Sequence, residues 1–196
     1  RWHALMEFVQ DDPAQSSPGD LAMHVLEDAI AQNLLENATI ASSDVQAEAF
    51  WKIRDSIAEA ERAAGAALQH DISVPGAAMA RFIEQQSPRI EADYPGTKTV
   101  AFGHLGDGNI HFHVKAPEGV DIAAWYAGDG KAITSHVYDR VRAYGGSLSA
   151  EHGIGQSKID EFARLSEPAR LSALRAIKSA LDPLGIMNPG KLVPLA

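Results

Sequence analysis

The chain has 196 residues, 45% of them hydrophobic and 22% charged, which are ordinary values for a globular protein with a sizeable core. Its 17 Lys and Arg residues against 26 Asp and Glu residues give a net charge of −9, and no basic run is long enough to follow a phosphate backbone, so nucleic acid is not an expected partner. The sequence also excludes a disulfide framework, because it contains no cysteine, and an apolar membrane span of about 20 residues; we expect a cytoplasmic protein.

The N-terminal third is predicted to alternate strands and helices. Residues 2–9 are typical of a strand and come with no initiator Met or signal peptide, so we expect a fragment of a longer protein. Ser17-Pro18-Gly19-Asp20 has the form of an N-cap followed by Pro at the first helical position, and it predicts a helix from about 18 to 35. A short strand is expected at 39–42.

The next helix, from about 43 to 65, is predicted by the capping box Ser43-Asp44-Val45-Gln46. Phe50, Ile53 and Ile57 have the spacing of a buried stripe, and Arg54 lies on or beside that stripe. Such an arginine either extends to the surface or pairs with a carboxylate of the protein, or it binds the carboxylate of a substrate through two parallel hydrogen bonds.

A β-hairpin is predicted in the middle of the chain, at 97–115. Before it, residues 71–74 alternate as a strand, and Pro75 is expected to start a helix that ends near 86–88. Asp107-Gly108 separates the two strand-like runs of the hairpin, a pattern that favours a two-residue type I′ turn.

This turn defines a register for the hairpin and brings histidines together. The expected pairs are Gly106 with Asn109, His104 with His111, and Phe102 with His113. Three imidazoles then share one face, while Leu105, Ile110, Phe112 and Val114 share the other. Paired residues have Cβ atoms about 5 Å apart, from which two imidazoles can bind one metal ion. The alternative is a solvated sheet face that happens to carry histidines.

Beyond the hairpin, a polar segment at 147–158 lies between predicted helices. The helix before it is interrupted at 128–130 and ends at Gly145-Gly146, and a last amphipathic helix is expected at about 167–181. Glu151-His152-Gly153 within the polar segment suggests a tight active-site loop, although a solvated loop explains the same residues. The helices and the central hairpin together predict an α+β fold, an antiparallel sheet with helices packed on it and a C-terminal helical segment.

Three motifs follow one another in a characteristic order: Gly103-His104 to His111, Glu151-His152-Gly153-Ile154-Gly155, and Asn188-Pro189-Gly190-Lys191. Together they resemble the C-terminal half of FAD-linked oxidases of the D-lactate, glycolate and D-2-hydroxyglutarate dehydrogenase type, within the vanillyl-alcohol oxidase superfamily. The resemblance runs over nearly the whole chain. It implies that residues 1–196 form a ferredoxin-like cap domain and that the FAD-binding domain of the protein is absent from this chain, which is then expected to be inactive alone.

The resemblance also implies a site and a reaction, oxidation of a D-2-hydroxy acid to the 2-oxo acid. By analogy with the hydroxyglutarate branch, His104, His111 and Glu151 bind a divalent metal, zinc or manganese. His152 is then the catalytic base, Arg54 binds the substrate carboxylate, and Asn188 and Lys191 contact FAD. A homodimer is a possible assembly.

The chain departs from the hydroxyglutarate branch at three substrate positions. Ala58 stands where that branch has Thr, Gln69 where it has Lys, and His113 where it has Asn. His113 is therefore a candidate substrate-binding residue, and the lost hydroxyl and ammonium groups weaken the case for a dicarboxylate. Lactate-like and glycolate-like substrates are expected as much as hydroxyglutarate.

Two other functional classes use the same residues. A non-redox domain would hold a structural metal in a closed site with His113 as fourth ligand, whereas an enzyme keeps a position open for solvent or substrate. A metal-dependent hydrolase would need no flavin.

Overall fold

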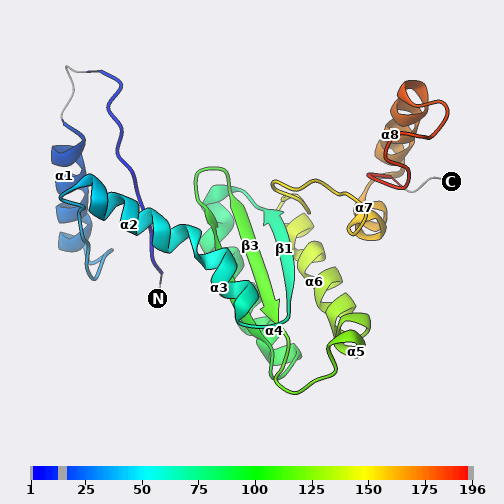
Figure 1. Ribbon diagram of the computed structural model, residues 1–196, viewed down its shortest axis with the longest axis horizontal. Coiled ribbons are helices and arrows are strands. Elements are labelled where there is room, and N and C mark those ends of the chain that lie inside the picture. The colour runs from blue at the N-terminus through cyan, green and yellow to red at the C-terminus, as the bar shows by residue number, and fades with distance from the viewer. Residues whose placement is uncertain (1, 13–16, 194–196) are drawn as a thin grey trace. The chain divides into compact units, whose positions relative to one another are not determined.

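The computed structural model describes residues 2–12 and 17–193 (Figure 1). The chain divides into two compact units, Arg1–Ala64 and Gly65–Ala196. Among the described residues, no helix combines the length and apolarity that crossing a bilayer requires.

The first unit consists of helices α1 (Pro18–Ala31), α2 (Asp44–Asp55) and α3 (Ile57–Ala63). The predicted strands at 2–9 and 39–42 are wrong, since both segments lack regular structure; a strand needs a hydrogen-bonded neighbour, and the described part of this unit contains none. Helix α1 ends four residues earlier than the predicted residue 35, because Asn33 adopts a left-handed conformation (φ 57°). Leu34 N–H then donates to Ala29 O, which closes the helix as in a Schellman motif.

The second unit contains a three-stranded antiparallel sheet of β1 (Ala67–Ser73), β2 (Lys98–His104) and β3 (Asn109–Lys115). Strand β3 lies between the other two, in the order β1-β3-β2. The outer edge of β1 also forms a single antiparallel bridge between Ser73 and Ser147. The predicted α+β fold is confirmed, and its ferredoxin-like connectivity is present with the fourth strand reduced to this bridge.

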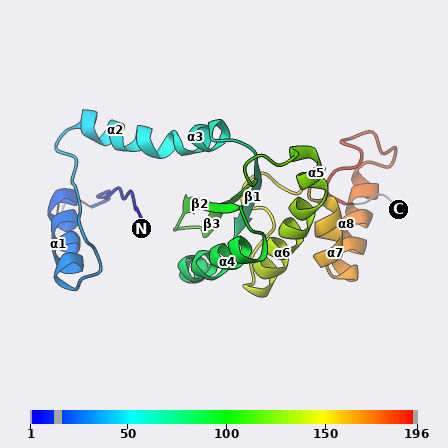
Figure 2. The same ribbon diagram turned by 90° about the horizontal axis from the view of Figure 1, so that it is seen from below.

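Helices α4 (Met79–Asp93) and α6 (Asp129–Ala143) cover one face of the sheet (Figures 1 and 2). Fully buried side chains of both helices, such as Phe82 and Val137, pack there on Ile110 and Phe112 of β3. Hydrophobic packing also explains why α4 continues through Pro88, contrary to the predicted end, since Ile90 beyond the proline is fully buried.

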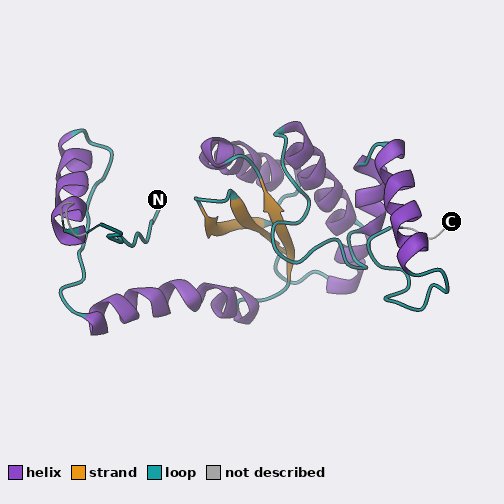
Figure 3. Cartoon of the chain, turned by 90° about the horizontal axis from the view of Figure 1, so that it is seen from above, coloured by secondary structure: helices purple, strands orange, loops and turns teal. Residues whose placement is uncertain are grey.

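The described part of the second unit contains four further helical elements. The short 3-10 helix η1 (Gly76–Ala78) precedes α4, and α5 (Ile122–Ala127) precedes α6. After α6, the chain runs without regular structure before α7 (Ile159–Leu165), which the sequence did not predict, and α8 (Pro168–Leu181), which it did (Figure 3).

His70 of β1 is a buried histidine whose role is structural. Its Nδ1 lies 3.0 Å from the main-chain oxygen of Phe112, and its Nε2 lies 3.2 Å from the hydroxyl of Thr134 in α6. Because a carbonyl oxygen only accepts, Nδ1 carries the proton, and Thr134 donates to Nε2. The neutral ring therefore joins the sheet to α6.

We expect the protein to lose stability as the pH falls from 6.5 to about 4. Burial lowers the pKa of His70 from 6.5 to about 4, so in this window the unfolded chain binds a proton that the folded one does not. At about 1.4 kcal/mol per pH unit the loss is roughly 3 kcal/mol. Urea unfolding at several pH values measures it, and His70→Gln should lack most of this slope; an unchanged slope in that variant would contradict the assignment.

Candidate active site

The histidine hairpin forms, with a register that differs from the predicted one. His104 pairs with Asn109, Phe102 with His111, and Val100 with His113. The predicted pairing was therefore wrong by two residues. Because side chains alternate with a period of two, such a shift leaves the side chains of the two strands on their predicted faces, and the histidines still share the face opposite the core. The prediction for Leu105 is wrong, because this residue lies in the loop after β2 and is 71% exposed instead of packing on the apolar face.

A contact with Val74, just after the end of β1, explains the four-residue loop, 105–108, that replaces the predicted two-residue turn. The main-chain oxygen of Gly108 accepts a hydrogen bond from Val74 N–H at 3.0 Å. A Cβ atom on Gly108, whose φ is +73°, would lie 1.9 Å from Val74 O. Asp107 Oδ1 accepts from Asn109 N–H at 3.0 Å. The loop is thus shaped by the chain that follows β1.

On the open face of the sheet the imidazoles lie near one another. The ring centres of His104 and His111 are 6.4 Å apart, and those of His111 and His152 are 6.5 Å apart. Phe102 packs against both His111, at 5.0 Å, and His113, at 5.2 Å. His113 is only 6% exposed.

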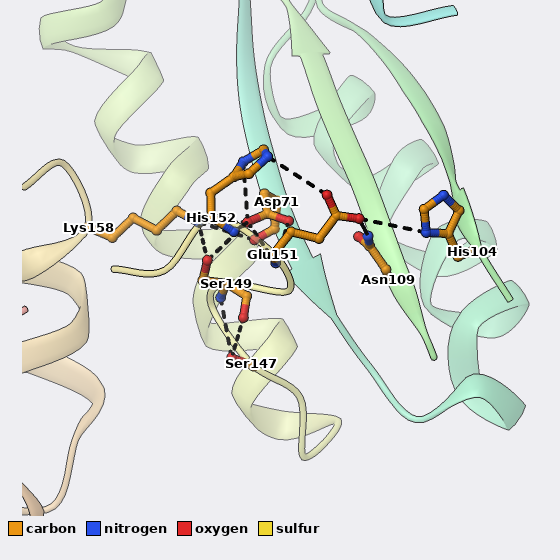
Figure 4. A network of polar contacts seen from close by, with 8 residues as sticks. All are labelled: Asp71, His104, Asn109, Ser147, Ser149, Glu151, His152 and Lys158. Carbon is orange, nitrogen blue, oxygen red and sulfur yellow. Dashed lines mark hydrogen bonds and ion pairs between the residues drawn. The ribbon is translucent and has the colours of Figure 1, made fainter. Parts of the chain in front are cut away.

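The polar segment after α6 is attached to β1 through Asp71, as Figure 4 shows. Oδ2 of Asp71 accepts hydrogen bonds from the Ser149 hydroxyl and from His152 N–H, both at 3.0 Å. Oδ1 accepts from Glu151 N–H at 3.2 Å. The Lys158 ammonium donates to Oδ2 of Asp71 at 3.3 Å and to Ser149 Oγ at 3.0 Å. One carboxylate thus gathers four donors from a single segment.

Asp71 remains charged although it is only 5% exposed. Burial by itself raises the pKa of Asp71, but the His152 N–H, the Ser149 hydroxyl and the Lys158 charge outweigh it and hold the pKa at about 2. Burial lowers the pKa of Lys158, and the contact with Asp71 opposes that change. The pair is an ionic anchor at neutral pH.

Glu151 and His152 extend toward the hairpin from this polar segment, residues 147–158, which we call the anchored segment. Oε1 of Glu151 accepts a hydrogen bond from Asn109 Nδ2 and lies 3.7 Å from His104 Nδ1. The His152 ring is 69% exposed, with Nδ1 3.6 Å from Asp71 Oδ2 and Nε2 3.8 Å from Glu151 Oε2. An exposed imidazole between two carboxylates is suited to accepting a proton.

The chemical types of the three predicted metal ligands suit a divalent ion, and the positions of two of them do as well. Two imidazoles and a carboxylate are common ligands of zinc. Two atoms bound to one zinc ion at about 2.1 Å lie roughly 3.4 Å apart at a tetrahedral angle, close to the 3.7 Å between His104 and Glu151. However, no three such side chains within the described ranges are gathered closely enough to hold a metal ion.

Gly146 is required where the segment meets β1. A Cβ atom there would lie 2.1 Å from Ser73 O, next to the two hydrogen bonds between Ser73 and Ser147, of 3.0 and 2.9 Å. Gly146→Ala should therefore destabilise the protein by about 1–3 kcal/mol. Chemical denaturation measures this against Gly106→Ala, which has open space around it; equal effects of the two variants would contradict the prediction.

The other predicted site residues lie elsewhere in the chain. Arg54 belongs to α2 in the first unit and is half-buried, so its substrate role stays a prediction. The stripe predicted beside it is partly wrong, because Ile53 is 68% exposed. Lys191 donates to Gln156 Oε1, and Leu192 N–H donates to Gly155 O at 3.1 Å. The C-terminal turn therefore contacts the polar segment.

The sequence did not single out Asp71, Asn109, Ser149 or Lys158 as site residues. Ser149 and Lys158 belong to the anchored segment, and Asp71 and Asn109 contact it. The available signal was Asp71 itself, a charged residue within a strand that alternates with apolar Ile72 and Val74. A carboxylate on an otherwise buried strand implies a cationic or hydrogen-bonding partner. Nothing local identified that partner, since Lys158 is 87 residues away.

The chain resembles known proteins over nearly its full length. The model of the family "FAD linked oxidases, C-terminal domain" matches residues 1–192. The D-2-hydroxyglutarate dehydrogenase of Stutzerimonas stutzeri is 31% identical over 97% of this chain and 40% of its own length. That of Xanthomonas citri is 33% identical over 97% of this chain and 39% of its own length. The mitochondrial D-2-hydroxyglutarate dehydrogenase of Arabidopsis thaliana is 34% identical over 84% of this chain and 28% of its own length.

This chain thus spans two-fifths or less of the length of these curated relatives. The match covers both compact units of the structure, including the histidine hairpin and the anchored segment. The chain belongs to the FAD-linked oxidases, as their C-terminal domain.

Proposed function

We propose that this chain is the substrate- and metal-binding part of a FAD-dependent dehydrogenase that oxidises a D-2-hydroxy acid to the 2-oxo acid. The observation that carries the proposal is the pair Glu151 and His152, held by Asp71 beside the histidine face of the sheet. A base and candidate metal ligands on one open face suit a 2-hydroxy acid, which offers a hydroxyl and a carboxylate.

In the proposed reaction, His152 takes the proton of the substrate hydroxyl while the C2 hydride leaves. The two ring nitrogens of His152 face the carboxylates of Asp71, at 3.6 Å, and Glu151, at 3.8 Å. FAD supplies the acceptor for the hydride. Arg54 would bind the substrate carboxylate, for which a planar guanidinium is well suited.

A divalent metal, zinc or manganese, is proposed to bind His104, His111 and Glu151. Support comes from the donor types and from the distance between His104 and Glu151, and binding requires the three side chains to come closer together. The ion would lower the pKa of the substrate hydroxyl.

We assign Asn188 and Lys191 to the flavin contact, whereas most of the FAD site would belong to the N-terminal domain. In their favour, exposed apolar side chains, Ile186 and Met187, precede Asn188, a combination that suits a planar ring with polar edges. Location in the cytoplasm and a homodimer remain proposals; the relatives from Arabidopsis thaliana and Bos taurus are named mitochondrial.

The substrate is proposed to be a D-2-hydroxy acid that need not carry a second carboxylate. Gln69 and His113, two of the positions that depart from the hydroxyglutarate branch, are directly paired across β1 and β3. Both changes therefore concern one spot on the sheet face. A neutral glutamine there has no ammonium group with which to bind a second carboxylate of the substrate. Lactate-like and glycolate-like substrates are therefore proposed on equal terms with hydroxyglutarate.

The test is flavin bleaching in the intact protein. Anaerobic addition of D-lactate, glycolate or D-2-hydroxyglutarate should bleach the flavin, and L-lactate should not. If no acid bleaches it while metal is bound, a non-redox metal domain is favoured; metal-dependent ester cleavage without bleaching would indicate a hydrolase.

Arg54→Lys should lower kcat/KM by roughly 10- to 150-fold, the equivalent of about 1.5–3 kcal/mol for a charged hydrogen bond, with unchanged flavin content. Lysine keeps the charge but loses the planar fork. The measurement compares a 2-hydroxy acid with its methyl ester in wild type and variant. An equal loss with acid and ester would make Arg54 a structural arginine instead.

A further inference from the structure

Asp71 holds two consecutive main-chain N–H groups, those of Glu151 and His152, with one carboxylate. Consecutive peptide planes that share an acceptor cannot rotate independently. The directions in which the Glu151 and His152 side chains leave the backbone therefore depend on Asp71. The segment itself has no regular structure at these residues that would define those directions.

The position of Asp71 in the sheet relates this segment to the histidines. Asp71 is the direct partner of His111 in the pairing of β1 with β3, and His111 is in turn the partner of Phe102 on β2. Two residues further along β1, Ser73 forms the bridge to Ser147. The segment is thus attached to β1 at two points, one of them directly across from His111.

The charge of Asp71 is stabilised by the same segment that it holds. A buried carboxylate is costly unless it is paired and hydrogen-bonded. Lys158, whose side chain is 12% exposed, supplies the countercharge and also donates to Ser149. The side chain of Asp71 is itself only 7% exposed, so it cannot serve as an open ligand for substrate.

We propose that Asp71 is a positioning residue: its carboxylate, neutralised by Lys158, sets where Glu151 and His152 stand relative to the histidine hairpin. The part of this inference that concerns turnover rests on the proposed function. The part that concerns the main-chain anchor does not, and it can be measured separately.

The test compares Asp71→Asn with wild type in the intact protein. Asparagine has nearly the same shape but replaces one oxygen by an NH₂ group. This group is itself a donor, so it cannot accept the hydrogen bonds that the N–H, O–H or ammonium donors make to that oxygen in wild type. Backbone amide exchange at Glu151 and His152 should become about 10- to 100-fold faster. Amides of Ile110 and Phe112 in the core should keep their rates.

Turnover provides the second readout. A displaced base lowers the rate of the chemical step, so kcat should fall by about 10²-fold, with KM and flavin content nearly unchanged. Asp93→Asn is the matched control, because that carboxylate lies exposed on α4 beside Arg89; it should change neither readout. Lys158→Met should give the same changes as Asp71→Asn, to a smaller extent.

Unchanged exchange at Glu151 and His152 in Asp71→Asn overturns the proposal whatever happens to turnover. Faster exchange with full turnover also overturns it, since the anchor would then not position the base. If Asp71→Asn fails to fold, with core amides exposed too, Lys158→Met decides by the same two criteria. If wild type itself fails to bleach with any hydroxy acid, the proposed function is wrong, and the exchange data alone decide whether Asp71 is the anchor.

Discussion

His152→Gln is expected to lower kcat by about 10²- to 10⁴-fold, the usual contribution of a positioned general base. Glutamine is similar in size and polar, but it cannot take the substrate proton at neutral pH. The anchor is unaffected, because Asp71 binds the main-chain N–H of residue 152. The side chain is 69% exposed, so stability should change by less than about 0.5 kcal/mol.

The measurement for His152→Gln is kcat with the best hydroxy acid from the bleaching panel, together with flavin content and the urea midpoint. His24→Gln is the control, since His24 is also an exposed imidazole beside a carboxylate, Asp28, 3.8 Å away. A loss of less than about threefold in His152→Gln would remove His152 from the role of base, because proton transfer contributes far more than that.

Glu151→Gln is expected to reduce metal affinity by more than about 100-fold, because even residues that only support a ligand contribute about 10- to 100-fold. Glutamine keeps one oxygen near Asn109 but loses the negative charge that attracts the ion. Removal of metal from wild type with a chelator should have the same effect on turnover as the substitution. Added zinc or manganese should restore the wild type and not the variant.

The metal-to-protein ratio after dialysis tests the prediction for Glu151→Gln directly. Glu118→Gln is a suitable control, since Glu118 is exposed between β3 and α5, away from the histidine face. Equal metal content in wild type, Glu151→Gln and Glu118→Gln would show that the three predicted ligands do not form a metal site. Turnover by the metal-free protein would separate that result from the proposed redox function.

Local sequence signals predicted those elements whose cause lies within a few residues. Ser17 and Ser43 cap the helices that they were expected to cap, because an N-cap needs only the N–H groups two or three residues ahead. The division of the hairpin strands into a histidine face and an apolar face was also correct, with Ile110 and Phe112 fully buried, although Leu105, predicted on the apolar face, is exposed in the loop. Alternation along a strand is a property of its backbone alone.

Errors occurred where a distant segment decides the local structure. The turn after His104 has four residues because Val74, beyond the end of β1, binds Gly108. Helix α4 passes through Pro88 because Ile90 is buried against the sheet. In each case tertiary packing outweighed a valid local preference.

The sequence by itself determined the α+β class, the starts of the two helices capped by Ser17 and Ser43, the shared face of the histidines and, through the order of its motifs, the family. Only the tertiary structure decided how the segment of Glu151 and His152 meets that face, because the connection is made by Asp71, about 80 residues earlier in the chain. A buried carboxylate needs hydrogen-bond donors or a cation close by, but the residues next to it in the sequence do not show which groups these are. Burial supplies the reason: once Asp71 leaves water, its charge is stabilised only by the N–H groups, hydroxyl and ammonium that folding brings to it.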